Sequence, residues 1–382
     1  MRFEIDTQIP YGNACDLALN ATSSTLEVSF SPDPHGGPET LWFCFRLRRS
    51  ESEGPEVSNI RLTLKHSYNI LGGQYQEAIR PVIRYEGGIW RRLPQGKIEK
   101  LPDGRSLIHW TTEVPNQYLD VAYCYPYGMP QVQSLVDETD GFWQVDTIGV
   151  SQGARPLIRL SNDYGEEKVA RPGLYVMARQ HAGETPGSWV LDGFLRAFAA
   201  LGPEAPLVWA VPLANIDAIE RGDYGKDNFP YDLNRAWGRP PMRHEVSVFQ
   251  RDLGRWRARC RPVLCIDFHA PGGTEPSGVF AYIPDPETDR GGHEIVKRWA
   301  AWTSDALTSR YAADDFARVA QYPSRWETPS FRTYAWFQVG VPCITFETSY
   351  ALAGDRVLRQ EDYRNIGERI AQAVVQGITR SL

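Results

Sequence analysis

The fold class is indicated by the stretch Leu174-Tyr-Val-Met-Ala-Arg-Gln-His-Ala-Gly-Glu-Thr-Pro-Gly-Ser-Trp-Val-Leu-Asp-Gly-Phe-Leu-Arg-Ala-Phe198, in which a helical pattern directly follows an apolar run. Residues 174–180 predict a short buried strand. Thr185 is expected to cap the helix, and Pro186 suits its first turn. A strand followed at once by a helix is the building unit of α/β proteins.

The same alternation continues downstream. Further strands are expected at residues 207–213, 263–268 and 343–346, and helices at residues 243–259, 292–311 and 361–379. Strands that alternate with helices indicate a largely parallel sheet covered by helices.

Residues 1–125 show a different, all-β pattern. Short alternating segments at residues 25–30, 40–47, 60–64, 78–84 and 119–123 are separated by clusters of Gly, Pro, Asp and Ser. Many short strands with such turns favour a sandwich. Because Pro and Gly interrupt both helix and strand, residues 125–130 mark a plausible boundary. We therefore expect an antiparallel β-sandwich at 1–125 and an α/β domain at 126–382.

Composition restricts the class of protein. The 382 residues are 42% hydrophobic and 23% charged, as in ordinary globular proteins, and the formal net charge of −6 gives no reason to expect nucleic acid or an anionic membrane as partner. The six cysteines form no CxxC pair, which indicates reduced thiols. The N-terminus lacks the pattern of a signal peptide. A cytoplasmic location is therefore expected.

Side chains with metal or acid–base chemistry follow three expected strands. His181, His269 and Glu347 stand at their carboxyl ends, and Glu184 is one step further. Ligands of open α/β sheets collect at such ends. Singly, each has a plain structural interpretation, as a core histidine or an ion-paired glutamate. Because these residues follow three separate strands, they together favour a metal hydrolase. In such an enzyme a catalytic zinc has three protein ligands and one open position.

A polar motif, Asp232-Leu-Asn-Arg235, lies between these strands. The planar guanidinium group of Arg235 can form two parallel hydrogen bonds with a carboxylate, and Asn234 adds a side-chain donor beside it. Asp232 can accept the free ring N–H of a zinc-bound histidine. The alternative is a charged turn, since Asn and Asp favour turns.

Together the motifs of residues 126–382 resemble the zinc metallocarboxypeptidases, and among them the cytosolic carboxypeptidase-like branch, which carries a β-sandwich before its catalytic domain. The resemblance rests on Tyr125-Pro-Tyr127, Ile148-Gly-Val-Ser-Gln-Gly-Ala-Arg-Pro-Leu157, Gln180-His-Ala-Gly-Glu-Thr185, Asp232-Leu-Asn-Arg235, Asp267-Phe-His269 and Thr345-Phe-Glu347, in the family's order. It implies a mixed, mostly parallel sheet of about eight strands between helices.

The resemblance also implies a metal centre. His181, Glu184 and His269 match the ligands of one Zn²⁺ per chain. Glu347 matches the general base, which takes a proton from water and later gives it to the leaving amine. Asp232 matches the hydrogen-bond partner of the first zinc histidine.

Substrate-binding roles follow in the same way. Asn234 and Arg235 match the pair that holds the terminal carboxylate of a substrate. Arg332 falls near the floor of the family's specificity pocket, where a basic residue in the cytosolic branch recognises an acidic C-terminal side chain. A surface or ion-paired arginine is the alternative. Tyr322 is the candidate for the family's mobile tyrosine.

One departure concerns the loop before the Asp-x-Asn-Arg motif. The family has an arginine there that stabilises the oxyanion, whereas this chain has Gly225. Lys226 and Arg221 are the candidates to replace it. Loss of one such donor typically costs ~10²–10³ in rate.

The resulting hypothesis is a zinc-dependent carboxypeptidase whose partner is the C-terminus of a peptide or protein, and it includes a preference for acidic C-terminal residues. The alternatives are a zinc amidohydrolase of small N-acyl amino acids, related to desuccinylases and aspartoacylases, and a non-catalytic peptide-binding relative. The histidines of the expected sandwich, His35 among them, receive no role.

Overall fold

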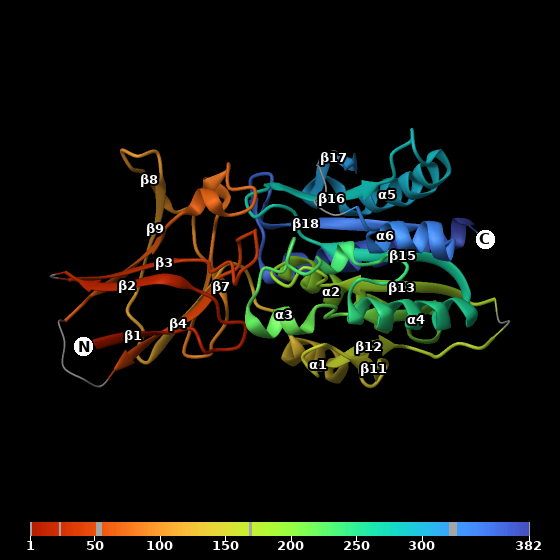
Figure 1. Cartoon of the computed structure of the whole chain (residues 1–382), viewed down its shortest axis with the longest axis horizontal. Helices are drawn as coiled ribbons and strands as arrows, with labels where there is room; N and C mark the ends of the chain where they lie inside the picture. Colours follow the sequence, from red (N-terminus) through yellow and green to blue (C-terminus); the bar gives the residue numbers. More distant parts are fainter. Residues whose placement is uncertain (1, 23, 51–55, 168–169, 321–326, 382) are drawn as a thin grey trace.

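The computed structural model describes residues 2–22, 24–50, 56–167, 170–320 and 327–381. Two five-stranded sheets are built from the N-terminal residues and one nine-stranded sheet from the rest. Figure 1 shows the two groups side by side along the long axis of the molecule.

The N-terminal sheets form a sandwich. One has the order β1-β4-β10-β6-β7 and the other the order β2-β3-β5-β9-β8, and every neighbouring pair is antiparallel except β3 with β5. Phe30 of β3 packs on Phe45 of β4 with ring centroids 4.8 Å apart, which joins the inner faces. The strands are β1 (Arg2–Asp6), β2 (Cys15–Ala21), β3 (Thr25–Ser31), β4 (Cys44–Ser50), β5 (Asn59–Leu64), β6 (Val82–Tyr85), β7 (Arg91–Arg92), β8 (Lys97–Lys100), β9 (Ser106–Thr112) and β10 (Tyr118–Ala122).

The large sheet has the order β11-β12-β14-β13-β15-β18-β16-β17, with β19 paired to β18. Its centre, β14-β13-β15-β18, is parallel throughout. Antiparallel pairs occur on both sides of this centre. The strands are β11 (Gln144–Val150), β12 (Pro156–Ser161), β13 (Pro172–Ala178), β14 (Leu207–Val211), β15 (Arg261–His269), β16 (Ser277–Ile283), β17 (Ala312–Val319), β18 (Cys343–Ala353) and β19 (Arg356–Val357). The mixed, mostly parallel sheet is confirmed.

Helices cover this sheet (Figure 1). Helix α2 packs on α7 and on strands β15 and β18, while α4 and α6 contact β13 and β15 respectively. The helices are α1 (Met129–Glu138), α2 (Thr185–Leu201), α3 (Ile216–Arg221), α4 (His244–Ala258), α5 (Arg290–Tyr311), α6 (Phe331–Tyr334) and α7 (Gln360–Ser381). No helix in the described part of the chain is long and apolar enough to cross a membrane.

Two local expectations near the site were wrong. Helix α2 begins at Thr185 with Glu184 in the N-cap position, so Thr185 is not the cap. Strand β18 runs on to Ala353, because β16 pairs with it antiparallel beyond Glu347. Glu347 therefore lies in the middle of a strand, not at its end, and its backbone is held from both sides.

The N-terminal pattern was also incomplete. The expected strand at residues 40–47 begins only at Cys44, and the expected strand at residues 78–84 only at Val82. Strand β2 was missed. Apolar residues alternate along it, but nearly all of its side chains are exposed and its register with β3 shifts, so that it adds no buried face.

A continuous apolar core joins the sandwich to the α/β part. Tyr123, just past β10, packs edge-on against Tyr350 of β18 with ring centroids 5.1 Å apart. Both rings are buried. The division at residues 125 and 126 stays a prediction, and it lies between β10 and β11.

Candidate metal centre and cavity

Three candidate ligands converge beyond β13 and β15. His181 and Glu184 lie in the turn between β13 and α2, and His269 is the last residue of β15. The two carboxylate oxygens of Glu184 lie 2.8 Å from His181 Nδ1 and 2.7 Å from His269 Nδ1. One ligand atom from each residue lies within 4.8 Å of the other two. Two imidazoles and one carboxylate at this separation suit a divalent cation such as zinc.

Each imidazole meets a further carboxylate on its other nitrogen. His181 Nε2 lies 3.2 Å from both oxygens of Asp232, and His269 Nε2 lies 2.8 Å from Asp267 Oδ2. A proton on Nε2, donated to the carboxylate, leaves the Nδ1 lone pair for a metal. Asp232 and Asp267 therefore orient both rings and favour a proton on Nε2, as a metal bound at Nδ1 requires.

The charges of this buried cluster are strongly coupled. Burial alone lowers the pKa of His181 and of His269, but the neighbouring carboxylates outweigh it and raise both. Burial raises the pKa of Glu184, but the two histidines bring it well below its usual range. Asp232 behaves like Glu184, because His181 lowers its pKa against the effect of burial. A cluster with more carboxylates than imidazoles attracts a cation.

Glu347 faces the same space from the adjacent strand. Its Oε2 is buried and has no hydrogen-bond partner among the described residues. Burial raises the pKa of Glu347 to about 7, and Glu184 raises it too, against the opposing charges of His269 and Lys226. A carboxylate with a near-neutral pKa and an unpaired oxygen can both accept and release a proton.

One cavity of about 360 Å³ joins these groups. Three basic residues, Lys226, Arg235 and Arg332, are among those that line it, which suits an anionic ligand. The lining residues are His181, Lys226, Asn234, Arg235, His269, Tyr282, Ala320, Glu327, Thr328, Pro329, Ser330, Arg332, Thr333, Thr345 and Glu347.

The Asp-Leu-Asn-Arg motif forms a short 3-10 helix (Leu233–Arg235) at the wall of this cavity. Asp232 starts it by accepting a hydrogen bond from Asn234 N at 2.7 Å. The Asn234 amide donates to Asp267 Oδ2 at 3.3 Å and accepts from Phe331 N at 2.9 Å, which ties the motif to β15 and α6. Arg235 is half-buried and lines the cavity.

The two replacements considered for the missing arginine lie in different places. Lys226 lines the cavity, and its Nζ lies 3.8 Å from Glu184 Oε1. Arg221 does not line it: its guanidinium donates to Asp223 Oδ2 at 2.7 Å, and its side chain is 59% exposed. The structure therefore brings Lys226 to the site but not Arg221, because Arg221 ends helix α3 and lines a separate cavity with residues of the sandwich, His35 among them.

Gly225 itself has a conformation that an arginine would strain. Its φ is +82°, and a Cβ atom placed on it would lie 2.8 Å from Ala182 N. L-residues rarely adopt this backbone region. Where the family has an arginine, this chain thus has a glycine that packs closely against the turn with the metal ligands.

The remaining substrate-binding candidates are only partly described. Arg332 lies on α6 and lines both the main cavity and a neighbouring cavity of about 190 Å³. Tyr322 lies outside the described residues.

Asp267 and Tyr282 are among the residues of the site that were not sequence candidates for it. Asp267 pairs with His269, and alternation along a strand could have indicated this, because residues two apart share a face. Tyr282 of β16 lines the cavity, and no motif in the sequence around Tyr282 indicated this.

No family model matches the chain. Cytosolic carboxypeptidase 2 of Xenopus tropicalis is 26% identical over 331 residues, which cover 77% of this chain and 32% of that protein. The chain thus spans about a third of the length of this relative.

Two solved structures share the fold over nearly the whole chain. A metallo-carboxypeptidase from Burkholderia cenocepacia aligns with a TM-score of 0.77 at 16% identity and covers 100% of both chains. A metallo-carboxypeptidase from Pseudomonas aeruginosa, in complex with (2-guanidinoethylmercapto)succinic acid, aligns with a TM-score of 0.74 at 18% identity over 98% of this chain and 99% of that one. The sandwich and the α/β part therefore occur together in solved structures.

Proposed function

We propose that this chain, a member of the cytosolic carboxypeptidase-like family of metallocarboxypeptidases, is a zinc-dependent carboxypeptidase that hydrolyses the last amide bond of a peptide or protein. One observation carries the proposal. A single cavity contains candidate metal ligands, a buried carboxyl group with a pKa of about 7, and basic side chains suited to a terminal carboxylate. The names of the relatives include the word cytosolic, and we extend a cytoplasmic location to this chain.

His181, Glu184 and His269 would hold the zinc ion. Zn²⁺ bound by three protein ligands supplies a positive charge that lowers the pKa of a water molecule to about 7 and polarises a carbonyl group. Asp232 and Asp267 keep the two imidazoles in the correct tautomer and orientation.

Glu347 is the general base and later the general acid. As a carboxylate it takes the proton of the attacking water, and as a carboxylic acid it gives that proton to the nitrogen of the leaving amine when the C–N bond breaks. The proposal is supported by its unpaired Oε2 and by the rigid position of Glu347 within β18.

Arg235 binds the terminal carboxylate of the substrate. Its fork of N–H donors matches the two carboxylate oxygens, and Asn234 adds a polar group on the same wall of the cavity. This requirement explains why the enzyme would cut only beside a free C-terminus.

Lys226 stabilises the negative charge that develops on the oxygen of the reacting carbonyl group. Its ammonium group lies in the same cavity as Glu347 and the metal ligands, where a positive charge stabilises negative charge that develops on oxygen. Lys226 would thereby take over part of the role of the family's arginine.

Arg332 sets a preference for a C-terminal Glu or Asp. It lines the cavity on α6, 15 positions before Glu347 in the chain, and its positive charge would pair with an acidic side chain of the substrate. The preference rests on this one charge.

A panel of peptides with one body and different last residues tests the function. The zinc-loaded protein should release a C-terminal Glu or Asp faster than Leu or Lys, and it should leave the C-terminally amidated control intact. Release of amino acids from N-acyl amino acids but from no peptide would instead identify an amidohydrolase. Equal cleavage of free and amidated C-termini would exclude a carboxypeptidase.

A further inference from the structure

The sandwich touches the catalytic part at the segment that carries Lys226. We call residues 222–232 the Lys226 loop. It runs from the end of helix α3 to the Asp-Leu-Asn-Arg motif. Its neighbours belong to two different regions, the turn with the metal ligands on one side and segments of the sandwich on the other.

The first side of the loop contacts the metal-ligand turn directly. Gly183 N donates to Tyr224 O at 2.8 Å, in the middle of His181-Ala-Gly-Glu184. Asp227 N donates at 2.9 Å to Asp232 Oδ2, and Asp232 also contacts His181. A shift of this loop would therefore move both the Lys226 ammonium and the partners of the metal ligands.

The other side is fastened to the sandwich through polar contacts. His35 Nδ1 lies 2.8 Å from Asp223 Oδ1, and the Asp223 carboxylate is buried. Asn13 Nδ2 donates to Gly222 O at 2.8 Å, and Asn13 Oδ1 accepts from Asp33 N at 2.7 Å. The contacts of His35 with Asp223 and of Asn13 with Gly222 join residues 188 and 209 positions apart in the chain.

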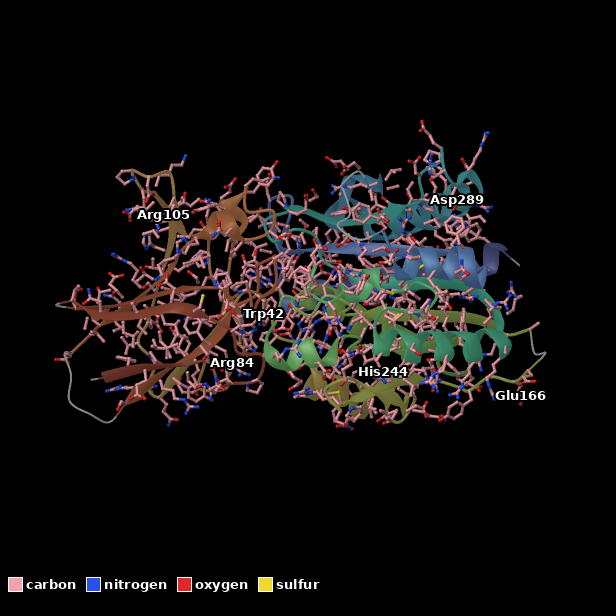
Figure 2. All side chains as sticks on the ribbon, in the orientation of Figure 1. Trp42, Arg84, Arg105, Glu166, His244 and Asp289 are labelled. Atoms are coloured by element: carbon pink, nitrogen blue, oxygen red, sulfur yellow. The ribbon has the colours of Figure 1, made fainter. Side chains whose placement is uncertain are left out.

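Close backbone packing adds to these hydrogen bonds. Gly222 has a φ of +73°, and a Cβ atom on it would lie 2.3 Å from Gly12 O, so the two backbones lie against each other. Figure 2 shows Trp42 at this junction between the sandwich and the catalytic part. A Cβ on Gly183 would lie 3.2 Å from the Cβ of Trp42, so the sandwich also reaches the metal-ligand turn.

We propose that His35 of the sandwich is a positioning residue, which holds the Lys226 loop through Asp223 and so keeps the Lys226 ammonium in the catalytic cavity. The inference rests on the proposed role of Lys226 in catalysis. It also assigns a task to the sandwich, namely to complete the support of the catalytic site.

Two variants of His35 and one control variant test this role. His35 has a φ of +48°, and asparagine tolerates that backbone region and carries an N–H donor where the imidazole has Nδ1. His35→Ala should lower kcat by about 10-fold or more with little change in KM, because a small displacement of a catalytic group is costly. His35→Asn should restore most of kcat. His66→Ala is the matched control, since His66 also has a positive φ of 55° and lies 3.7 Å from a carboxylate, that of Asp16, within the sandwich.

A double-mutant cycle separates positioning from general stability. If His35 acts through Lys226, His35→Ala should change kcat by less than about 2-fold in a Lys226→Ala background, because the group it positions is then gone. The same fall of kcat in both backgrounds would overturn the proposal.

Hydrogen exchange gives a readout that needs no activity. In His35→Ala, amides of residues 181–184 and 222–228 should exchange faster than in the wild type, and in His66→Ala they should not. Unchanged exchange in His35→Ala would overturn the proposal even if the wild type hydrolyses no peptide. In that case the missing hydrolysis would refute the proposed function separately.

Discussion

His269 and Glu347 are direct register partners on the neighbouring parallel strands β15 and β18. One supplies a candidate metal ligand and the other the candidate base, so a single pair of hydrogen-bonded strands fixes the spacing between them. Glu347 lies inside an 11-residue strand and is paired on its other side with Phe280 of β16. A base held by strands on both sides is better preorganised than one on a loop.

Glu347→Gln should strongly reduce turnover without loss of the metal. The amide has nearly the same size as the carboxyl group but cannot accept the proton, and general-base catalysis contributes ~10²–10⁴ in rate. Steady-state kinetics and metal analysis of the same preparation check this. Near-wild-type kcat in a metal-loaded variant would refute the role of Glu347.

The pH profile should show the ionisation of Glu347. Its pKa, raised to about 7 mainly by burial, means that the group is largely neutral below that pH and ionised above it. Since the base must be ionised, kcat/KM should fall about tenfold per pH unit on the acid side. A bound divalent cation lowers the pKa, so this limb lies at or below pH ~7 for the zinc enzyme. Glu347→Gln should remove the limb from any residual activity.

Asp267→Asn should weaken metal binding although Asp267 is not itself a proposed ligand. Its Oδ2 lies 2.8 Å from His269 Nε2 and also accepts from Gln180 Nε2 at 2.7 Å. Loss of such a partner typically costs 10–100-fold in metal affinity. Competition with a chelator measures the affinity. Asp252→Asn, at a buried carboxylate that pairs with Arg159 away from the cavity, is the control and should leave the affinity unchanged.

Gly225→Arg should fail to restore a family-like arginine. The φ of +82° and the contact with Ala182 N would cost ~1–2 kcal/mol of stability or more. Thermal unfolding should therefore show a lower Tm, and kcat should not rise. Gly254→Arg is the control, because a Cβ atom on Gly254 would have open space around it. A Gly225→Arg variant with wild-type Tm and higher kcat would contradict this account.

Arg332→Met should change which peptides are preferred. Loss of a charge-assisted hydrogen bond to the substrate would lower kcat/KM for a peptide ending in Glu by ~1.5–3 kcal/mol, about 10- to 150-fold. The same body ending in Leu is the internal control and should keep its rate or gain. Parallel losses for both peptides would show that Arg332 acts on structure and not on specificity.

Local patterns were sufficient for the four central strands of the large sheet, β13, β14, β15 and β18, and for helices α2, α4, α5 and α7, but the remaining strands and helices of the α/β part were not predicted. Apolar runs followed by helical patterns placed β13, β15 and α2 to within a few residues, and the motif at His181 and Glu184 could be recognised because its two residues are only three positions apart. The exposed strand β2 was missed although its partner β3 follows it directly in the chain, since it has almost no buried side chains. The extension of β18 could not be recognised from local patterns, because it depends on pairing with β16, which is remote in the chain.

The sequence by itself determined the fold class and the chemical types available at the strand ends, since periodicity and residue identity are local properties. Only the tertiary structure decided which cation faces the cavity: Lys226 reaches it and Arg221 pairs with Asp223 outside it, although the two are only five positions apart. It also decided that His35 meets the Lys226 loop. These relations depend on where loops from the sandwich and from the large sheet meet, and such distances are set by packing between segments that are far apart in the chain.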